Sequence, residues 1–365
     1  MDAVVTGVAV AAHAADGPLA RLSLDKVIVQ LPARRRIGVV GYAGYGRSMH
    51  IPPLINQRWW VHRGRVNPAE RTRHQGNAAR HRGKEACVIL VIGAGSRTGQ
   101  ELVRLLRASA VPARTLTRPA DPAGGPDSVV GDLAEPATLD RAMADVDKVF
   151  LLASAARGEL SWHQNAIGAA ARAGVAHLVR SSILGADPAA PARFLRDHGQ
   201  ADEQLRASGV PWTILRPNFY MHNVTALWPP TLDGQGNYYA PAADARISMV
   251  DARDVAAVAA RALTEEGHAG KAYDVTGPEA LSHGEAGRKL GGRLGRPVQY
   301  VPVDDVSARS AMLSAGIGEW LADGLIELYQ DYRRSGTDGY AAQVHGTVLE
   351  VTGSAPRTLD QALAG

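Results

Sequence analysis

The sequence predicts an α/β fold, a doubly wound parallel sheet with a smaller C-terminal lobe. An apolar run at 88–92 leads straight into a glycine-rich turn and a helical pattern at 101–108, as a buried parallel strand and its crossover helix would. Apolar runs then alternate with helical stretches as far as residue 215. The chain has 365 residues, 45% of them hydrophobic, so it can bury a full core.

The expected elements follow the order of right-handed βαβ units. Strands are predicted at 88–92, 111–117, 128–130, 149–153, 177–181 and 212–215, and helices at 101–108, 137–145, 160–173 and 199–208. Between residues 312 and 332 apolar and aromatic residues recur at helical spacing and predict a pair of helices over a pocket. The residues of this pattern that we expect in the core are Trp320, Leu321, Leu325, Leu328 and Tyr329.

The first 85 residues hold the excess positive charge. The net charge is +4, but residues 57–85 carry eight Arg and Lys against two Glu. That segment shows neither helical nor strand periodicity, which is typical of a poorly ordered arm. Residues 36–46 resemble a second glycine loop, but Pro52 and Pro53 prevent a helix from following it. We expect residues 1–85 to be a basic extension, and this local charge does not favour nucleic acid as a partner.

Composition excludes several classes of protein. The single cysteine, Cys87, allows no internal disulfide and no Cys-based zinc site, which fits the reducing cytoplasm. The twelve histidines show no metal-ligand spacing, so no metal is expected. No run of about 18 apolar residues is present, so no membrane span is expected.

The glycine loop has the pattern of a dinucleotide site. Gly93 permits a tight turn, small residues let backbone N–H groups approach a pyrophosphate, and Gly99 lets the helix pack closely on the strand. Serine stands at 96, so phosphate binding requires an ordinary φ there. The residues predicted to bind the cofactor in this loop are Gly93, Ala94, Gly95, Ser96, Arg97, Thr98 and Gly99.

The end of the second strand indicates which nicotinamide nucleotide binds. An acidic residue there would bind the ribose 2′-OH, but this chain has Arg118. Arg118, with Arg97 from the loop, would pair with a 2′-phosphate. NADP(H) is therefore preferred and NAD(H) is possible. The alternative is that both arginines are solvated surface charges.

These residues resemble the NmrA-like family of atypical short-chain dehydrogenase/reductases, including quinone-reductase-like and azoreductase-like members. The resemblance covers residues 86–365. The motifs that carry it, in order, are VILVIGAGSRTGQELV at 88–103, VVGDL at 129–133, VFLLAS at 149–154, HLVRSS at 177–182, LRASGVPWTILRPNFYMHN at 205–223, ISMVDARDVAAVAARAL at 247–263, YDVTGPEALS at 273–282 and APRTLDQ at 355–361.

The resemblance implies a Rossmann-type sheet at about 86–215 and a substrate lobe from about 216–365. It further implies an adenine pocket at Asp132 and Leu133, cofactor contacts at Ala153 and Ser154, Ser182 beside the nicotinamide, and an enclosing turn of Pro217, Asn218 and Phe219.

Five further residues are expected to line the pocket or to hold the surrounding structure together. Tyr220, Met221 and His222 would line the pocket mouth. Asp251 and Asp254 are expected to be structural: they would cap the following helix and tie the lobe to the sheet.

The chemistry departs from that of a typical short-chain dehydrogenase, because none of the five lysines follows a tyrosine by four residues. Relatives in this family often carry a Lys and a Glu one helical turn apart before the LRxSG motif, and His198 and Asp202 occupy those positions. The two share a helix face, so Asp202 would orient His198 as the catalytic proton donor. The alternative is a surface histidine near the start of a helix.

Two functions remain open at this point. One is an NADPH-preferring cytoplasmic oxidoreductase that reduces a small quinone-like, azo or carbonyl compound, because hydride transfer needs no protein nucleophile. The other is a non-catalytic regulator that senses NADP(H) and acts through a protein partner. Either would be a monomer or a homodimer.

Overall fold

The computed structural model describes residues 87–118 and 127–365, so the predictions for residues 1–85 lie outside the described residues. A seven-stranded parallel sheet forms the centre, in the order β3-β2-β1-β4-β5-β6-β9. Its strands are β1 (Ile89–Ile92), β2 (Ala113–Thr117), β3 (Ser128–Val130), β4 (Lys148–Leu151), β5 (His177–Ser181), β6 (Trp212–Pro217) and β9 (Lys271–Val275). The predicted doubly wound sheet is confirmed.

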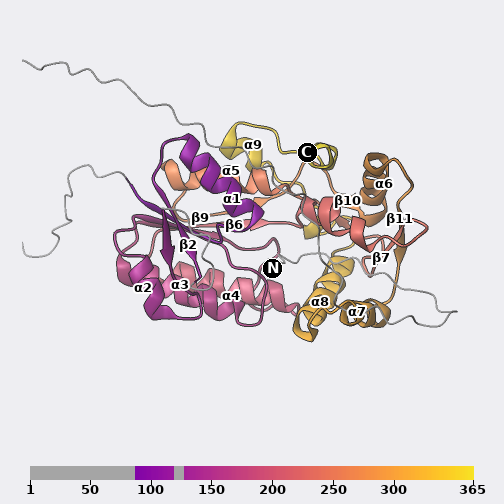
Figure 1. Cartoon of the computed structure of the whole chain (residues 1–365), viewed down its shortest axis with the longest axis horizontal. Helices are drawn as coiled ribbons and strands as arrows, with labels where there is room; N and C mark the ends of the chain where they lie inside the picture. Colours follow the sequence, from indigo (N-terminus) through magenta and orange to yellow (C-terminus); the bar gives the residue numbers. More distant parts are fainter. Residues whose placement is uncertain (1–86, 119–126) are drawn as a thin grey trace, which may run out of the picture. The chain divides into compact units, whose positions relative to one another are not determined.

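Helices cover both faces of the sheet (Figure 1). One face packs on α2 (Pro136–Ala142), α3 (Glu159–Ala173) and α4 (Arg193–Ala207), and the other on α1 (Arg97–Ala108) and α5 (Ala252–Thr264). Alternate strand residues serve the two cores: Leu90 and Leu178 face the first group of helices, and Ile89 and Val179 face the second. The strand order reverses between β1 and β4, where ligands of such sheets bind.

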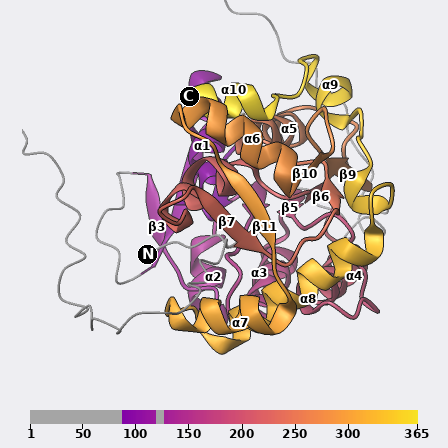
Figure 2. The ribbon, with the colours of Figure 1, turned by 90° about the vertical axis from the view of Figure 1, so that its right-hand side faces the viewer.

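The lobe is built on two short strand pairs. β7 (Asn237–Ala240) runs parallel to β11 (Gln299–Pro302), and β8 (Arg246–Ile247) runs antiparallel to β10 (Leu281–Ser282). Figure 2 shows β7 and β11 between α6 (His283–Leu294) and the pair α7 (Asp305–Ser314) and α8 (Glu319–Ser335). This pair confirms the predicted helices at 312–332: Leu325, Leu328 and Tyr329 are core residues, and Trp320 and Leu321 pack against them.

Several boundaries differ from the predicted ones. α1 begins at Arg97, four residues early, because the Ser96 side chain caps it. α4 begins at Arg193, six residues early. The sheet unit also takes β9 and α5 from beyond residue 215. The remaining short elements are a π-helix (Asn223–Leu227), 3₁₀ turns (Pro229–Thr231 and Tyr340–Ala342), α9 (Thr347–Thr352) and α10 (Leu359–Ala364).

Asp251 and Asp254 have the predicted structural roles. Asp251 is the N-cap of α5, where its carboxylate accepts from the Arg253 backbone N–H at 2.8 Å. Asp254 accepts from the Arg357 backbone N–H at 2.7 Å and pairs with the Arg357 side chain. None of the helices in the described part of the chain has both the length and the apolar character that a membrane crossing requires.

Candidate functional site

The residues predicted to bind the cofactor gather at one edge of the sheet. Because all seven strands are parallel, every segment that directly follows a strand lies at the carboxyl edge. The predicted segments all follow strands: residues 93–99 after β1, Arg118 after β2, Asp132 and Leu133 after β3, Ala153 and Ser154 after β4, Ser182 after β5, and Pro217 and Asn218 at the end of β6.

Close backbone contacts in the glycine loop leave no room for a side chain at Gly93 or Gly99. Gly93 has φ +86°, and a Cβ there would lie 2.5 Å from the Leu152 carbonyl oxygen. A Cβ on Gly99 would lie 2.2 Å from the Gly93 carbonyl oxygen. Glycine at both positions therefore leaves a bare backbone cradle at the start of α1, where the helix dipole favours an anion. This cradle fits the pyrophosphate of a dinucleotide.

Ser96 holds the loop in shape. Its φ is −72°, within the ordinary region for a residue with a side chain. The hydroxyl accepts from the Gly99 backbone N–H at 3.0 Å and donates to the Gly93 carbonyl oxygen at 2.8 Å. The Ser96 side chain thus adds two hydrogen bonds to the turn.

The two predicted 2′-phosphate ligands lie on neighbouring elements. Arg97 is the first residue of α1, and Arg118 directly follows β2, which pairs with β1. Both side chains are exposed.

The pKa of His222 is lowered to about 4, first by burial and secondly by the positive charge of Arg97. His222 is therefore neutral at pH 7.

Protein contacts fix the backbone of the predicted adenine pocket. The Asp132 carboxylate accepts from the Ala134 backbone N–H at 2.8 Å. The Leu133 carbonyl oxygen accepts from the Asn165 side-chain amide on α3 at 2.9 Å. These bonds set the path of the chain after β3.

Ser182 and Asn218 differ in what they can offer a ligand. Ser182 is buried, and its hydroxyl has no partner among the described residues. The Asn218 side chain is fully engaged: it donates to the Ser248 hydroxyl at 2.9 Å and the Ala341 carbonyl at 2.8 Å, and it accepts from the Phe219 N–H at 2.8 Å. Asn218 therefore holds the predicted turn together from within.

His198 has other partners than the predicted one. Its Nε2 lies 3.0 Å from the Glu159 carboxylate on α3, and its Nδ1 lies 2.9 Å from an Arg180 guanidinium nitrogen on β5. Asp202 instead pairs with Arg180 and, at 3.3 Å, with Arg216. The expectation that Asp202 orients His198 is wrong, because Arg180 occupies the space between helix and strand and takes that carboxylate.

Sequence reasoning missed Glu159, His163 and Arg180. Glu159 and His163 are one helical turn apart on α3, and that spacing was the available signal. Their ring and carboxylate lie 3.6 Å apart. Burial would raise the pKa of Glu159, but His198 and His163 lower it below its usual range. Burial, and secondly Arg180, lower the pKa of His163 to about 3.

Tyr220 lies on the face of the sheet that is covered by α1 and α5. Burial raises the pKa of the Tyr220 hydroxyl, and hydrogen bonds to the Thr98 and Ser181 side chains offset part of this rise. Its ring lies 5.1 Å from that of His222, centre to centre. Tyr220 thus links the glycine loop to the end of β5.

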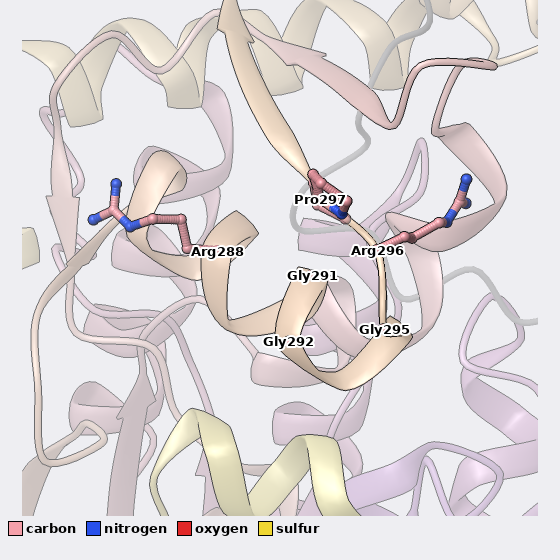
Figure 3. A pocket seen from close by; sticks show the side chains of 7 residues that line it. Arg288, Gly291, Gly292, Gly295, Arg296 and Pro297 are labelled. Carbon is pink, nitrogen blue, oxygen red and sulfur yellow. The ribbon is translucent and has the colours of Figure 1, made fainter.

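A separate pocket of about 420 Å³ lies at the end of α6. Its lining is Arg288, Gly291, Gly292, Gly295, Arg296, Pro297 and Val298, none of which is a predicted site residue. Figure 3 shows the Arg288 and Arg296 side chains pointing away from each other on opposite sides of it. The pocket therefore has no converging polar groups.

Comparison with known proteins supports nucleotide binding at the glycine loop. Residues 93–266 match the family model for NAD(P)H-binding proteins. The chain is 39% identical over 276 residues to NAD(P)H azoreductase of Xenophilus azovorans, covering 74% of this chain and 95% of that one. It is 37% identical over 275 residues to (4-alkanoyl-5-oxo-2,5-dihydrofuran-3-yl)methyl phosphate reductase of Streptomyces griseus, with coverage of 74% and 94%.

A third relative has a solved structure. Over 197 residues the chain is 32% identical to quinone oxidoreductase 2 of Escherichia coli, covering 54% of this chain and 68% of that one. The crystal structure of the NADPH complex of that protein superposes with a TM-score of 0.67 and 28% identity, over 76% of this chain and 98% of the other. With this Rossmann-type cradle and these relatives, the chain belongs to the NAD(P)H-binding family of NmrA-like reductases, and it is an NAD(P)H-dependent oxidoreductase.

Proposed function

We propose that the protein prefers NADPH and reduces a small quinone-like, azo or carbonyl compound by hydride transfer, without a Tyr-x-x-x-Lys pair. The observation that carries this proposal is the bare backbone cradle between Gly93 and Gly99 at the carboxyl edge. When bound there, the nicotinamide nucleotide supplies the hydride, and the chain supplies its position.

The NADPH preference rests on charge at the adenosine end. Arg118 follows β2, where an acidic residue would otherwise bind the ribose 2′-OH, and Arg97 opens the neighbouring helix. Guanidinium groups pair well with phosphate through charge-assisted hydrogen bonds. The relative with a solved NADPH complex supports the same nucleotide.

The choice of acceptor is supported by the relatives, whose names specify an azo compound, a dihydrofuranone phosphate and a quinone. We also propose cofactor contacts for the remaining predicted residues, because they lie at the carboxyl edge of the sheet. They are Asp132, Leu133, Ala153, Ser154, Ser182, Pro217 and Asn218. For Asn218 that contact would be through the backbone. A cytoplasmic location follows from the single cysteine and from the need for NADPH.

The test compares kcat/KM for NADPH and NADH with one quinone, in the full chain and in Arg118→Gln and Arg97→Gln. We expect the preference for NADPH to fall at least about tenfold in each variant, because a charge-assisted bond to the phosphate is lost. Arg104→Gln is the control, since Arg104 lies further along α1 and pairs with Glu101. An equal loss with both nucleotides would contradict the proposed phosphate contact.

NADP(H) binding without reduction of any quinone, azo dye or aldehyde would contradict the proposed reaction. It would favour the NADP(H)-sensing regulator, for which calorimetry of the nucleotide alone is the supporting measurement. A partner protein would then have to bind with an affinity that depends on NADP(H).

A further inference from the structure

Two segments that are far apart in the sequence pair where the sheet meets the lobe. The Met221 N–H donates to the Val250 carbonyl oxygen at 2.8 Å, and the Val250 N–H donates to the Phe219 carbonyl oxygen at 2.9 Å. This pairing is an isolated parallel bridge outside the named strands. We name the two paired segments, residues 219–221 and 249–251, the joint.

The joint connects two hydrophobic cores, because its side chains alternate as they do in a strand. Phe219, Met221 and Met249 pack in the core of the lobe. Tyr220 and Val250 point the other way and pack in the core that α1 and α5 cover. A shift of the joint would therefore disturb the packing of both cores at once.

The Tyr220 hydroxyl reaches from the joint to the glycine loop. It forms hydrogen bonds with the side chains of Thr98 and Ser181, and all three residues are buried. Burial raises the pKa of Tyr220, so the hydroxyl is protonated at pH 7. A protonated hydroxyl can donate one hydrogen bond and accept another, so it can bond both partners at the same time.

The two partners of Tyr220 differ in how firmly they are held. Thr98 is the second residue of α1, so its backbone N–H has no partner within the helix and is available to an anion at the helix start. Ser181 is the last residue of β5, a strand that is paired on both sides. Tyr220 therefore ties the first turn of α1 to the centre of the sheet. The bonds of Ser96 cannot do this, because they close the loop on itself.

A second side chain of the same segment lies against the first turn of α1. The His222 ring is 5.1 Å from the Tyr220 ring, centre to centre. Arg97, the first residue of α1, is close enough for its charge to lower the pKa of His222. The segment that leaves the joint thus meets both of the first two residues of α1, where the cradle binds its anion.

From these contacts we infer that Tyr220 is a positioning residue for nucleotide binding: its hydroxyl holds the first turn of α1 in the shape that accepts the pyrophosphate, and it transmits nucleotide binding to the joint. An ordered loop and an ordered joint then favour each other, because coupling between two sites is reciprocal. This role goes beyond the proposed function. It gives Tyr220 no part in moving the hydride or a proton, and it holds for any acceptor.

The first experiment measures the Kd for NADPH by fluorescence titration of the full chain, in the wild type, Tyr220→Phe, Thr98→Val and the double variant. Phenylalanine and valine keep the packing of the ring and of the branched side chain, but they remove the hydrogen bond. We expect Kd to rise about five- to tenfold in Tyr220→Phe and at least about threefold in Thr98→Val. The double variant should bind within about twofold of the weaker single variant, because both changes break the same bond.

Tyr273→Phe is the matched control. The Tyr273 hydroxyl is 2.9 Å from Nδ1 of His268, which precedes β9 and so lies towards the opposite edge of the sheet. We expect its Kd for NADPH to stay within about twofold of the wild type. Thermal unfolding of both variants separates the two possible roles. A hydroxyl that only stabilises the fold would lower Tm in Tyr220→Phe and leave Kd unchanged.

Hydrogen exchange tests the transmission to the joint. The amides of Met221 and Val250 donate the two backbone bonds of the joint, so their exchange rates measure how often it opens. In the wild type we expect saturating NADPH to slow both rates at least about fivefold, and in Tyr220→Phe by less than about twofold. The measurement on the wild type needs no variant to fold.

Turnover separates positioning from chemistry. With a quinone as acceptor, we expect Tyr220→Phe to raise KM for NADPH while kcat at saturating NADPH stays within about threefold. A larger fall in kcat would overturn the inference, because the hydroxyl would then act in the reaction itself. So would an unchanged Kd, additive effects in the double variant, or equal exchange rates with and without NADPH in the wild type. Kd and exchange are measured without an acceptor, so NADPH binding without quinone reduction would count against the proposed function alone.

Discussion

Individual glycines set the shape of the cradle. The Gly99 backbone lies so close to the Gly93 carbonyl oxygen that a methyl group would be 2.2 Å from it. We therefore expect Gly99→Ala to displace the loop and to weaken NADPH binding at least about tenfold, because the cradle loses its fit to the pyrophosphate. Fluorescence titration with NADPH measures this.

The matched control is Gly292→Ala. Gly292 also lies within a helix, α6, but a Cβ there meets nothing within 4 Å. This change should stabilise the helix by up to about 1 kcal/mol and leave NADPH binding unchanged. Equal NADPH affinities in the two variants would contradict the assigned role of the loop.

Sequence reasoning worked best for residues whose partners are near in sequence. The need for glycine at 93 and 99 and an ordinary φ at Ser96 follow from one strand, turn and helix. The prediction failed for the partner of His198, because Glu159 lies 39 residues away in sequence and reaches the ring only through the packing of α3 against α4. Arg180 lies on β5 and Asp202 on α4, so the sequence of neither segment alone could show that the two side chains pair.

Among the elements, the C-terminal segment is tied to α5 by one buried carboxylate. Asp254 is 2% exposed and accepts from the Arg357 N–H. Asp254→Asn should cost about 2 kcal/mol, because the buried side chain loses a charge-assisted hydrogen bond to Arg357. Urea unfolding measures the loss, and limited proteolysis should then cut near residue 357.

Asp360 provides the comparison for this change. Its side chain is 62% exposed and pairs with Lys289 at the surface. Asp360→Asn should cost no more than about 1 kcal/mol. A similar cost in both variants would contradict the assignment of Asp254 as the tie between α5 and the end of the chain.

Element prediction succeeded where periodicity is strong. All six strands predicted up to residue 215 exist, and the pair α7 and α8 was expected from its apolar spacing. The π-helix Asn223–Leu227 and the two-residue strands β8 and β10 could not be foreseen, because such short elements are selected by tertiary contacts rather than by local pattern. The joining of β9 to β6 was likewise not visible in the local sequence.

The stability of the whole molecule should depend on pH through its buried histidines. His283 is fully buried, five aromatic rings lie within 6.3 Å of it, and burial lowers its pKa to about 3. The unfolded chain takes up a proton near pH 6.5 and the folded chain does not, so stability is complete above pH 6.5 and falls as the pH drops towards 3. His283 alone should account for about 2 kcal/mol between pH 7 and pH 5.

Urea unfolding of the wild type and of His283→Leu at pH 7 and pH 5 tests this effect. The variant should lose about 2 kcal/mol less than the wild type between these two values. His268→Gln, which removes a less buried ring, should change the pH dependence by less. An unchanged pH dependence in His283→Leu would show that this ring is not held neutral.

At the scale of the molecule, we expect the carboxyl edge of the sheet to carry the whole reaction. The most direct test mixes the full chain with NADPH and an excess of quinone and follows the nicotinamide absorbance, with Gly99→Ala alongside. We expect one NADPH to be consumed for each hydroquinone formed, and the variant to require at least about tenfold more NADPH for the same rate. NADPH that binds with normal affinity but is not consumed would contradict this expectation.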